Sequence, residues 1–272
     1  MAFKRLRSLI TLLLAIAAPA AHGAERALEI AGLKVTMWSA DGIDSPARRP
    51  VILFSHGFHG CATQSRFLME AFAKAGYLVF APNHADATCA GGAAARPNAS
   101  EQPFRRPEWW TEDTYRDRAM DLRNLLAAIG GDARFNADTT RVGLAGAWPR
   151  WTLDNVRAVL ALSPYTHPFA ANNTLRNIAV PVMYQGGTRD VGLTPELKRG
   201  FGTYDSSPAP KYYVELDGAG HMAWTNFRST YHDSIAAYGV AFMDRYVRDL
   251  ADAGRALERK RADVTVLKHE GR

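Results

Sequence analysis

Short apolar runs rich in β-branched residues alternate with longer amphipathic stretches along most of the chain. The apolar runs predict strands, because buried parallel strands are short and nearly continuously hydrophobic. An alternating strand pair at 28–40 is followed by strands at 50–57, 77–84, 139–146, 156–164, 180–187 and 211–218. Helical periodicity predicts helices at 63–76, 111–131 and 231–254. This alternation predicts an α/β fold, with a mainly parallel central sheet and helices on both faces.

The two ends of the chain fall outside this alternation. Residues 1–23 begin with basic side chains, continue with an apolar run at 9–18 and end in small residues near Gly23. This pattern is typical of a secretory signal peptide, whose apolar run is too short to span a bilayer; a retained membrane anchor is the alternative. We therefore expect an exported protein, periplasmic or extracellular, with one domain at 24–250. Residues 251–272 are a charged tail, expected as a solvated helix or a frayed end.

Composition adds little to the partners that can be expected. The chain has 272 residues, 47% hydrophobic and 22% charged, which is typical of a globular protein. Its formal net charge of +6 falls to about +3 without the three basic residues of the signal segment. The remaining basic residues are not interleaved with aromatic ones, so a nucleic acid is not expected. No stable membrane span is expected, and the sequence does not fix an oligomeric state.

Two cysteines, Cys61 and Cys89, each follow a predicted strand. In an exported protein an even number of cysteines permits a disulfide. If the strands at 50–57 and 77–84 are parallel neighbours, both loops leave the sheet at the same edge, and a bridge is geometrically feasible. Two unpaired buried thiols are the alternative, because the sequence does not give the Cα separation that a bridge requires.

Candidate catalytic residues follow three of the predicted strands. Ligand sites in parallel α/β sheets form at the carboxyl ends of the strands. The turn at 55–60, SHGFHG, can present the Phe58 N–H to a developing oxyanion. Asp190 and His221 follow the last two parallel strands. An acid and then a histidine in these positions is the order of the last two triad members in α/β-hydrolases, where the acid orients the imidazole that takes the nucleophile's proton.

Each of these residues also has a purely structural interpretation. Asp190 could cap the following turn, His221 could be one surface histidine among eight, and a glycine turn after a strand is often only a turn. Their joint occurrence in this order favours an acid–base pair beside an oxyanion turn. Neither a metal nor another cofactor is expected, since four further polar residues of these loops lack the spacing of metal ligands: His56, His59, His84 and Asp86.

Six segments carry a resemblance to a known family. FSHGFHG, YLVFAPNH, VGLAG, AVLALSPY, PVMYQGGTRD and GAGHMAW together resemble the dienelactone hydrolase-like and platelet-activating-factor acetylhydrolase-like branch of the α/β-hydrolase superfamily. The similarity covers nearly the whole chain after the signal segment. It implies an α/β-hydrolase fold and a serine ester hydrolase that acts through an acyl-enzyme on a small-molecule or lipid-like ester. Asp190 would be the triad acid, His221 the base and the Phe58 amide one oxyanion donor, with no cofactor.

The nucleophile is missing from the place where the resemblance puts it. In the family, VGLAG leads into a nucleophile elbow of the form G-H-S-x-G-G and then a helix. Here Gly146 is followed by AWPRWTLDN, and no G-x-S-x-G occurs in the chain. Ser163 lacks flanking glycines, Ser55 precedes the oxyanion turn and Cys61 follows it. None of these three residues is expected to be the nucleophile.

The connection after Gly146 is also short. Parallel neighbours need a crossover of about a dozen residues or more, usually a helix, but only nine residues, 147–155, separate the two strands. In extended form nine residues reach about 30 Å, whereas nine helical residues rise only about 14 Å. The chain can therefore return along a strand of about 20 Å only without a packed helix. We expect a shortened crossover that leaves apolar sheet surface uncovered.

Two explanations account for this junction. The resemblance suggests an internal deletion of about a dozen residues that fused two similar GLAG segments and removed the serine, the second oxyanion N–H and most of one helix. Alternatively, the chain is a natural, catalytically silent homologue. The resemblance thus implies an exported carboxylic ester hydrolase that is inactive or severely impaired in this chain. A non-catalytic binding or scaffold protein that keeps the pocket is the alternative function.

Overall fold

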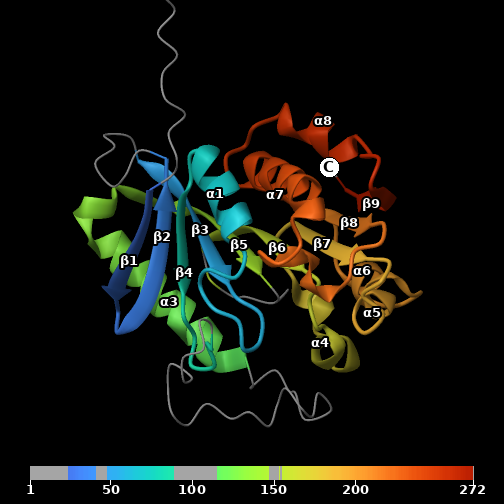
Figure 1. Ribbon diagram of the computed structural model, residues 1–272, viewed down its shortest axis with the longest axis horizontal. Helices are drawn as coiled ribbons and strands as arrows, with labels where there is room; N and C mark the ends of the chain where they lie inside the picture. Colours follow the sequence, from blue (N-terminus) through green and yellow to red (C-terminus); the bar gives the residue numbers. More distant parts are fainter. Residues whose placement is uncertain (1–23, 41–47, 89–114, 147–152, 154, 272) are drawn as a thin grey trace, which may run out of the picture.

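The computed structural model describes residues 24–40, 48–88, 115–146, 153 and 155–271. One nine-stranded sheet of order β1-β2-β4-β3-β5-β6-β7-β8-β9 passes through this part of the chain (Figure 1). Its strands are β1 (Ala24–Ile30), β2 (Leu33–Ser39), β3 (Arg49–Ser55), β4 (Leu78–Pro82), β5 (Ala137–Gly146), β6 (Val156–Leu162), β7 (Val182–Gly187), β8 (Lys211–Leu216) and β9 (Val264–Glu270).

The centre of the sheet is parallel and its two edges are antiparallel. Strands β4, β3, β5, β6, β7 and β8 pair in parallel, in that order. The β1–β2 hairpin adds an antiparallel edge beside β4, and β9 adds another beside β8. The prediction of a mainly parallel α/β sheet is confirmed.

Helices cover both faces of the sheet. The α-helices are α1 (Arg66–Lys74), α3 (Arg116–Gly131), α4 (His167–Ala171), α5 (Thr194–Lys198), α6 (Thr203–Ser206), α7 (His232–Tyr246) and α8 (Ala253–Glu258). Val51 and Leu53 of β3 belong to the apolar core that contains α3. Ile52 and Phe54 belong to the core that contains α1 and α7. Because β3 is buried on both faces, its residues 51–54 are continuously apolar rather than alternating.

The β5–β6 connection is short, as expected, yet the neighbouring sheet surface is covered. The two strands pair in parallel with nine residues between them. Leu144 of β5 and Val159 of β6 are both 2% exposed. They share a buried cluster with α3, with Leu153 of the connection and with Phe169 and Leu175 of the segment after β6. The expectation of uncovered apolar surface is therefore not met at these side chains, since other segments pack there.

The C-terminal residues belong to the sheet, in contrast to the solvated or frayed tail that we expected. β9 pairs with β8 along its length, and Val264 is buried. Leu257 of α8 is also fully buried in the core of α7. The run of three β-branched residues at 264–266 favours a strand despite the surrounding charges.

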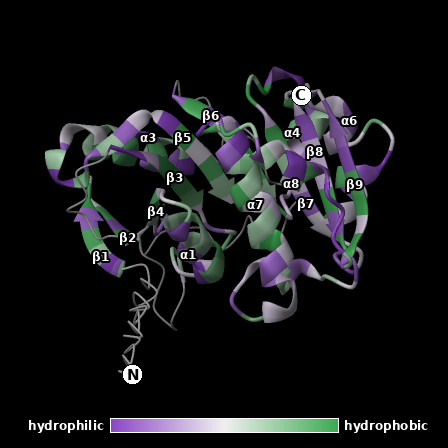
Figure 2. Cartoon of the chain, turned by 90° about the horizontal axis from the view of Figure 1, so that it is seen from above, coloured by the Kyte–Doolittle hydropathy of each residue, from purple (hydrophilic) through white to green (hydrophobic). Residues whose placement is uncertain are grey.

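The hydropathy pattern follows this architecture. In Figure 2, hydrophobic residues occur along the central strands, and the more hydrophilic segments lie toward the periphery. No helix among the described residues is long and apolar enough to cross a membrane. The predicted signal segment, 1–23, lies outside the described residues.

Candidate functional site

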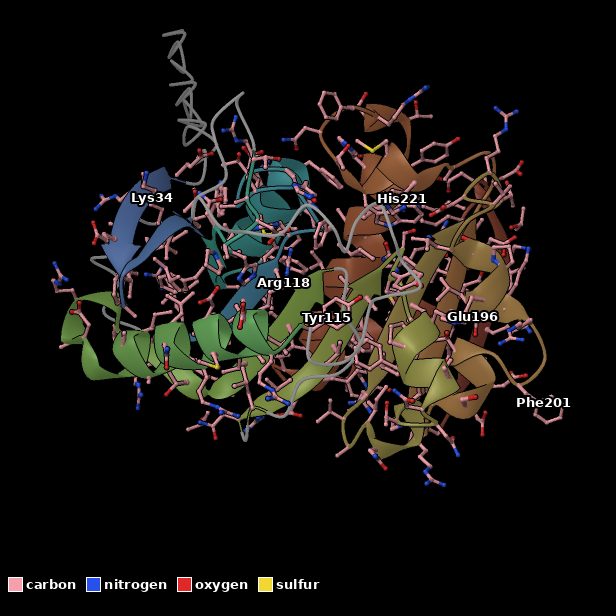
Figure 3. The ribbon with its side chains drawn as sticks, turned by 90° about the horizontal axis from the view of Figure 1, so that it is seen from below. Lys34, Tyr115, Arg118, Glu196, Phe201 and His221 are labelled. Carbon is pink, nitrogen blue, oxygen red and sulfur yellow. The ribbon has the colours of Figure 1, made fainter. Side chains whose placement is uncertain are left out.

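Asp190 and His221 lie together at the carboxyl edge of the sheet. Asp190 follows β7, and His221 opens a short 3₁₀ helix (His221–Trp224) after β8, the parallel neighbour of β7. The Nδ1 atom of His221 is 3.1 Å from Oδ2 of Asp190. The carboxylate side chain is 4% exposed, whereas the imidazole is 60% exposed. The two residues singled out from the sequence are thus in hydrogen-bond contact, and the histidine is open to solvent. Figure 3 labels the position of His221.

A close approach of two loops makes this contact possible. The Arg189 N–H donates to the Ala219 carbonyl at 2.9 Å, which ties the loop after β7 to the loop after β8. A Cβ atom on Gly187 would lie 2.3 Å from that same carbonyl oxygen, so the approach requires glycine. The backbone carbonyl of Asp190 accepts the N–H groups of the following turn. Its side chain is directed to His221 instead, in contrast to a purely capping role.

Ser163 joins the acid–base pair. It directly follows β6, is 3% exposed and has a left-handed backbone (φ 41°). Its hydroxyl donates a short hydrogen bond to Oδ2 of Asp190, and Oγ lies 3.2 Å from Nδ1 of His221. A triad nucleophile faces Nε2, the nitrogen opposite the acid. Ser163 therefore holds the carboxylate and is not placed as a nucleophile. Its position after the strand next to β7 was the only sequence signal for this role.

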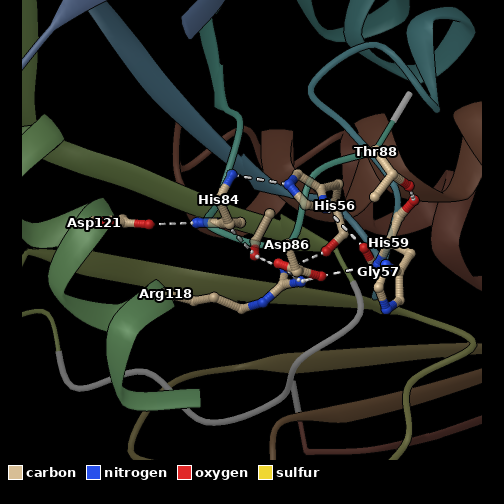
Figure 4. Close-up of polar contacts among 9 residues, drawn as sticks. His56, Gly57, His59, His84, Asp86, Thr88, Arg118 and Asp121 are labelled. Carbon is tan, nitrogen blue, oxygen red and sulfur yellow. Dashed lines mark hydrogen bonds and ion pairs between the residues drawn. The ribbon is translucent and has the colours of Figure 1, made fainter. Parts of the chain in front are cut away.

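A second serine–histidine–aspartate group lies at the ends of β3 and β4. Oγ of Ser55 is 2.9 Å from Nε2 of His84. Nδ1 of His84 is 2.9 Å from Oδ2 of Asp121 on α3 (Figure 4). This connectivity matches a catalytic triad. However, the three residues are only 3%, 1% and 8% exposed. A nucleophile must reach its substrate, so we interpret the group as internal support.

The same region contains a buried ion pair that sequence reasoning missed. Nη2 of Arg118 donates to both carboxylate oxygens of Asp86 at 2.7 Å. The residues are 4% and 8% exposed. Burial opposes ionisation of Asp86, but the charge of Arg118 and the His59 N–H hold its pKa below the ordinary value. Arg118 lies on the sheet-facing side of α3 among apolar positions such as Leu122, and this unusual placement was its only signal.

His56 is buried beside this ion pair as a neutral ring. Its Nε2 atom accepts the His84 N–H at 3.0 Å, and its Nδ1 atom is 2.7 Å from the Gly57 carbonyl. Burial and then the charge of Arg118 lower the pKa of His56 well below its ordinary value. Nδ1 therefore carries the proton and donates to the carbonyl. The ring fills a structural position, not one of the acid–base positions.

The predicted oxyanion turn begins beside Gly146, the residue after which the resemblance led us to expect the nucleophile. Ser55 and Gly146 are register partners at the ends of β3 and β5. Gly146 has φ +141°, and a Cβ atom there would lie 2.0 Å from the Ser55 carbonyl oxygen. Phe58, partly buried against the core of α3, lies in the turn that follows. Residues 147–152, where the elbow was expected, lie outside the described part of the chain.

Cys61 is disulfide-bonded and 5% exposed. Cys89, which the sequence permits as its partner, lies outside the described residues. The parallel pairing of β3 and β4, the condition set for a bridge between their loops, is present. A sulfur held in a disulfide is not available as a thiolate, so Cys61 is not placed to act as a nucleophile.

No cluster of three His, Cys, Asp or Glu side chains suited to a metal occurs among the described residues. One surface pocket lies at a distinct place, between α7 and the turn before β9, and its lining includes Ser234, Tyr238, Arg259 and Arg261. None of the residues of the groups above lines it.

Comparison with known proteins found no matching protein-family model and no matching curated protein.

Proposed function

We propose that the chain is an α/β-hydrolase of the exported ester-hydrolase type, with Asp190 as acid and His221 as base. The observation that carries this proposal is the 3.1 Å contact between Nδ1 of His221 and the buried carboxylate of Asp190. The residues follow adjacent parallel strands in the order acid, then histidine. This is the chain order and strand position of the last two α/β-hydrolase triad members.

In the complete enzyme, a serine after β5 would attack the ester carbonyl. His221 would take the hydroxyl proton at Nε2 and return it to the leaving alcohol, while Asp190 accepts the Nδ1–H and stabilises the imidazolium. The Phe58 N–H would donate to the oxyanion of the tetrahedral intermediate. Water would then hydrolyse the acyl-enzyme by the same proton path. Substrates would be small or lipid-like carboxylic esters.

In this chain we expect the acid–base pair to lack its nucleophile. Ser163 faces the acid side of His221, Ser55 is buried and Cys61 is disulfide-bonded. We attribute the missing serine to an internal deletion after Gly146. Sequencing the encoding DNA and its nearest relatives tests this origin, because an uninterrupted family that shares the short junction would refute the deletion.

An ester-hydrolysis assay tests the function. With p-nitrophenyl acetate and butyrate, we expect the chain to stay near the uncatalysed rate, since loss of a triad serine removes about 10⁶ of kcat. His221→Ala and Asp190→Asn should change nothing further, and His167→Ala, on an exposed histidine, is the matched control. Robust turnover that is lost in His221→Ala would reveal another nucleophile. Turnover that survives this substitution would refute the assigned pair.

A non-catalytic binding protein is the second candidate. It is favoured by the coexistence of a built acid–base pair with a chain that contains no G-x-S-x-G. Calorimetry with a substrate-like phosphonate ester separates the two functions. Saturable binding without turnover in this chain would support a binding role, and absence of binding would count against it.

A further inference from the structure

The buried ion pair of Arg118 and Asp86 forms hydrogen bonds to both ends of the turn after β3. Nη1 of Arg118 donates to the His56 carbonyl at 2.6 Å, and its Nη2 atom holds the carboxylate of Asp86 (Figure 4). Oδ2 of Asp86 in turn accepts the His59 N–H at 2.8 Å. The pair therefore spans the turn from the carbonyl of residue 56 to the N–H of residue 59. Between these two points lie Gly57 and Phe58.

Further hydrogen bonds fix the remaining groups of the turn. The His56 ring is held between the His84 N–H and the Gly57 carbonyl. The Thr88 hydroxyl donates to the His59 carbonyl at 2.6 Å. His59 itself has a left-handed backbone (φ 54°), a conformation uncommon for residues other than glycine. A backbone in such a conformation persists only when its surroundings hold it there.

Stability alone does not account for burying the two charges. Two charges that leave water lose hydration free energy, which their mutual attraction must offset. Replacing such a pair with apolar residues of similar volume often leaves a protein equally stable or more stable. What an ionic pair adds is direction, because the planar guanidinium presents its donors in a fixed fork. Arg118 uses this fork to join Asp86 and the His56 carbonyl in one arrangement.

We propose that Arg118 and Asp86 are positioning residues that orient the Phe58 peptide N–H toward an incoming oxyanion. This inference rests on the proposed function, because it takes the Phe58 N–H as the oxyanion donor. Such a donor acts only when it already points at the site where negative charge develops. The ion pair fixes the peptide group before Gly57 and the peptide group after Phe58. The peptide plane between Gly57 and Phe58, which carries the Phe58 N–H, is therefore prevented from rotating.

Selective ¹⁵N-phenylalanine labelling gives a readout that needs no turnover. The chain contains 12 phenylalanines, and Phe58→Leu identifies the Phe58 amide peak by its disappearance. In the wild-type chain we expect butyrate, a carboxylate that imitates an oxyanion, to shift this peak saturably. In Arg118→Met/Asp86→Leu we expect about tenfold weaker butyrate binding at this peak, equivalent to one lost hydrogen bond to a charged group.

The exposed pair Arg134–Asp132 is likewise an arginine–aspartate ion pair, in which Nε and Nη2 of Arg134 both donate to the carboxylate, and it gives the matched control. Arg134→Met/Asp132→Leu makes the same chemical changes away from the turn and should keep the wild-type shift. The peaks of Phe72 and Phe242, in the core of α1 and α7, report whether a variant is folded. If the first double variant loses them, Arg118→Lys is used, which keeps the charge but not the fork.

The outcomes separate the positioning role of Arg118 and Asp86 from the assignment of the Phe58 N–H as oxyanion donor. A wild-type shift that weakens in the double variant or in Arg118→Lys, with the core peaks unchanged, supports the positioning role. A shift retained in these variants overturns that role and leaves the oxyanion assignment intact. A wild-type chain whose Phe58 peak does not respond overturns the oxyanion assignment, and the inference with it.

Discussion

Gly146 occupies a position where the backbone of a neighbouring strand leaves no room for a side chain. Its φ of +141° and the 2.0 Å distance from a built Cβ to the Ser55 carbonyl oxygen both require glycine. We expect Gly146→Ala to lower the free energy of unfolding by about 3 kcal/mol, measured by urea denaturation. Gly131→Ala, at the end of α3 with open space around it, should stay within about 0.5 kcal/mol of the wild type. Equal effects of both substitutions would contradict the close approach at Gly146.

Ser163 combines backbone strain with a hydrogen bond to a buried carboxylate. Removing the hydroxyl in Ser163→Ala should cost about 2 kcal/mol, the usual value for a bond to a charged group. Ser163→Gly loses the same bond but relieves the left-handed backbone, which costs L-residues about 1 kcal/mol. The glycine variant should therefore be the more stable of the two in urea denaturation. The reverse order would show that φ at position 163 carries no strain.

At the residue scale, the sequence could predict residues whose chemistry follows from strand order. Asp190 and His221 were identified because loops after parallel strands meet at one edge. Arg118 and Asp121 were missed because their partners lie in other loops, at His56 and His84, and no local pattern encodes such contacts. Ser163 was rejected as a nucleophile, in agreement with its contacts, but its support of Asp190 depends on a side-chain direction that sequence does not specify.

At the scale of elements, α3 is joined to the loops after β3 and β4 by buried polar contacts of Arg118 and Asp121. Arg118→Met should leave Asp86 buried without its partner and lower the free energy of unfolding by about 4 kcal/mol. The double variant with Asp86→Leu should recover most of this loss, because both charges leave together. Urea denaturation of the two single variants and the double variant measures the coupling.

The exposed Arg134–Asp132 pair provides the comparison for this double-mutant cycle. Its coupling free energy should be small, since solvent screens ion pairs at the surface. A coupling at Arg118–Asp86 no larger than at the exposed pair would contradict the importance of the buried link.

The prediction of helices and strands succeeded where the hydrophobic pattern was clear, and it failed near the C-terminus, where charged residues obscured that pattern. All the strands expected between 28 and 218 are present. The parallel strands were predicted from their apolar runs, whereas the largely exposed β1 was predicted with β2 from their alternation. The final helix expected at 231–254 ends at Tyr246 and resumes as α8, with Asp249 left-handed between them. At 264–270, charged residues obscured the strand pattern of β9. This strand forms by pairing with the edge of β8 that β7 does not occupy.

At the scale of the whole molecule, the buried His56 ring should make stability depend on pH. Its pKa in the fold lies well below 6.5, with Arg118, His84 and Asp86 as the ionisable groups around it. Below pH 6.5 the unfolded chain takes up a proton that the fold does not, so stability is full above this pH and falls as the pH decreases toward the folded pKa. The slope contributed by one such group reaches about 1.4 kcal/mol per pH unit.

Urea denaturation between pH 7.5 and 5.5 measures this slope, and His56→Asn should reduce it. Asp86 does not interfere in this range, because a carboxyl with a lowered pKa loses its contribution only at more acidic pH. An identical slope in the variant and the wild type would show that His56 is not the responsible group.

The strand order also governs when the sheet can close as the chain is made. β3 is the first parallel strand to be synthesised, yet its partners β4 and β5 both come later, the second ending only at Gly146. Until that point, β3, which is apolar at residues 51–54, has no permanent neighbour on one side. β8 likewise waits for residues 264–270. An unfinished chain therefore presents two open strand edges, which are sites for unwanted pairing between chains, and an early stop before β9 should yield aggregates rather than a smaller soluble domain.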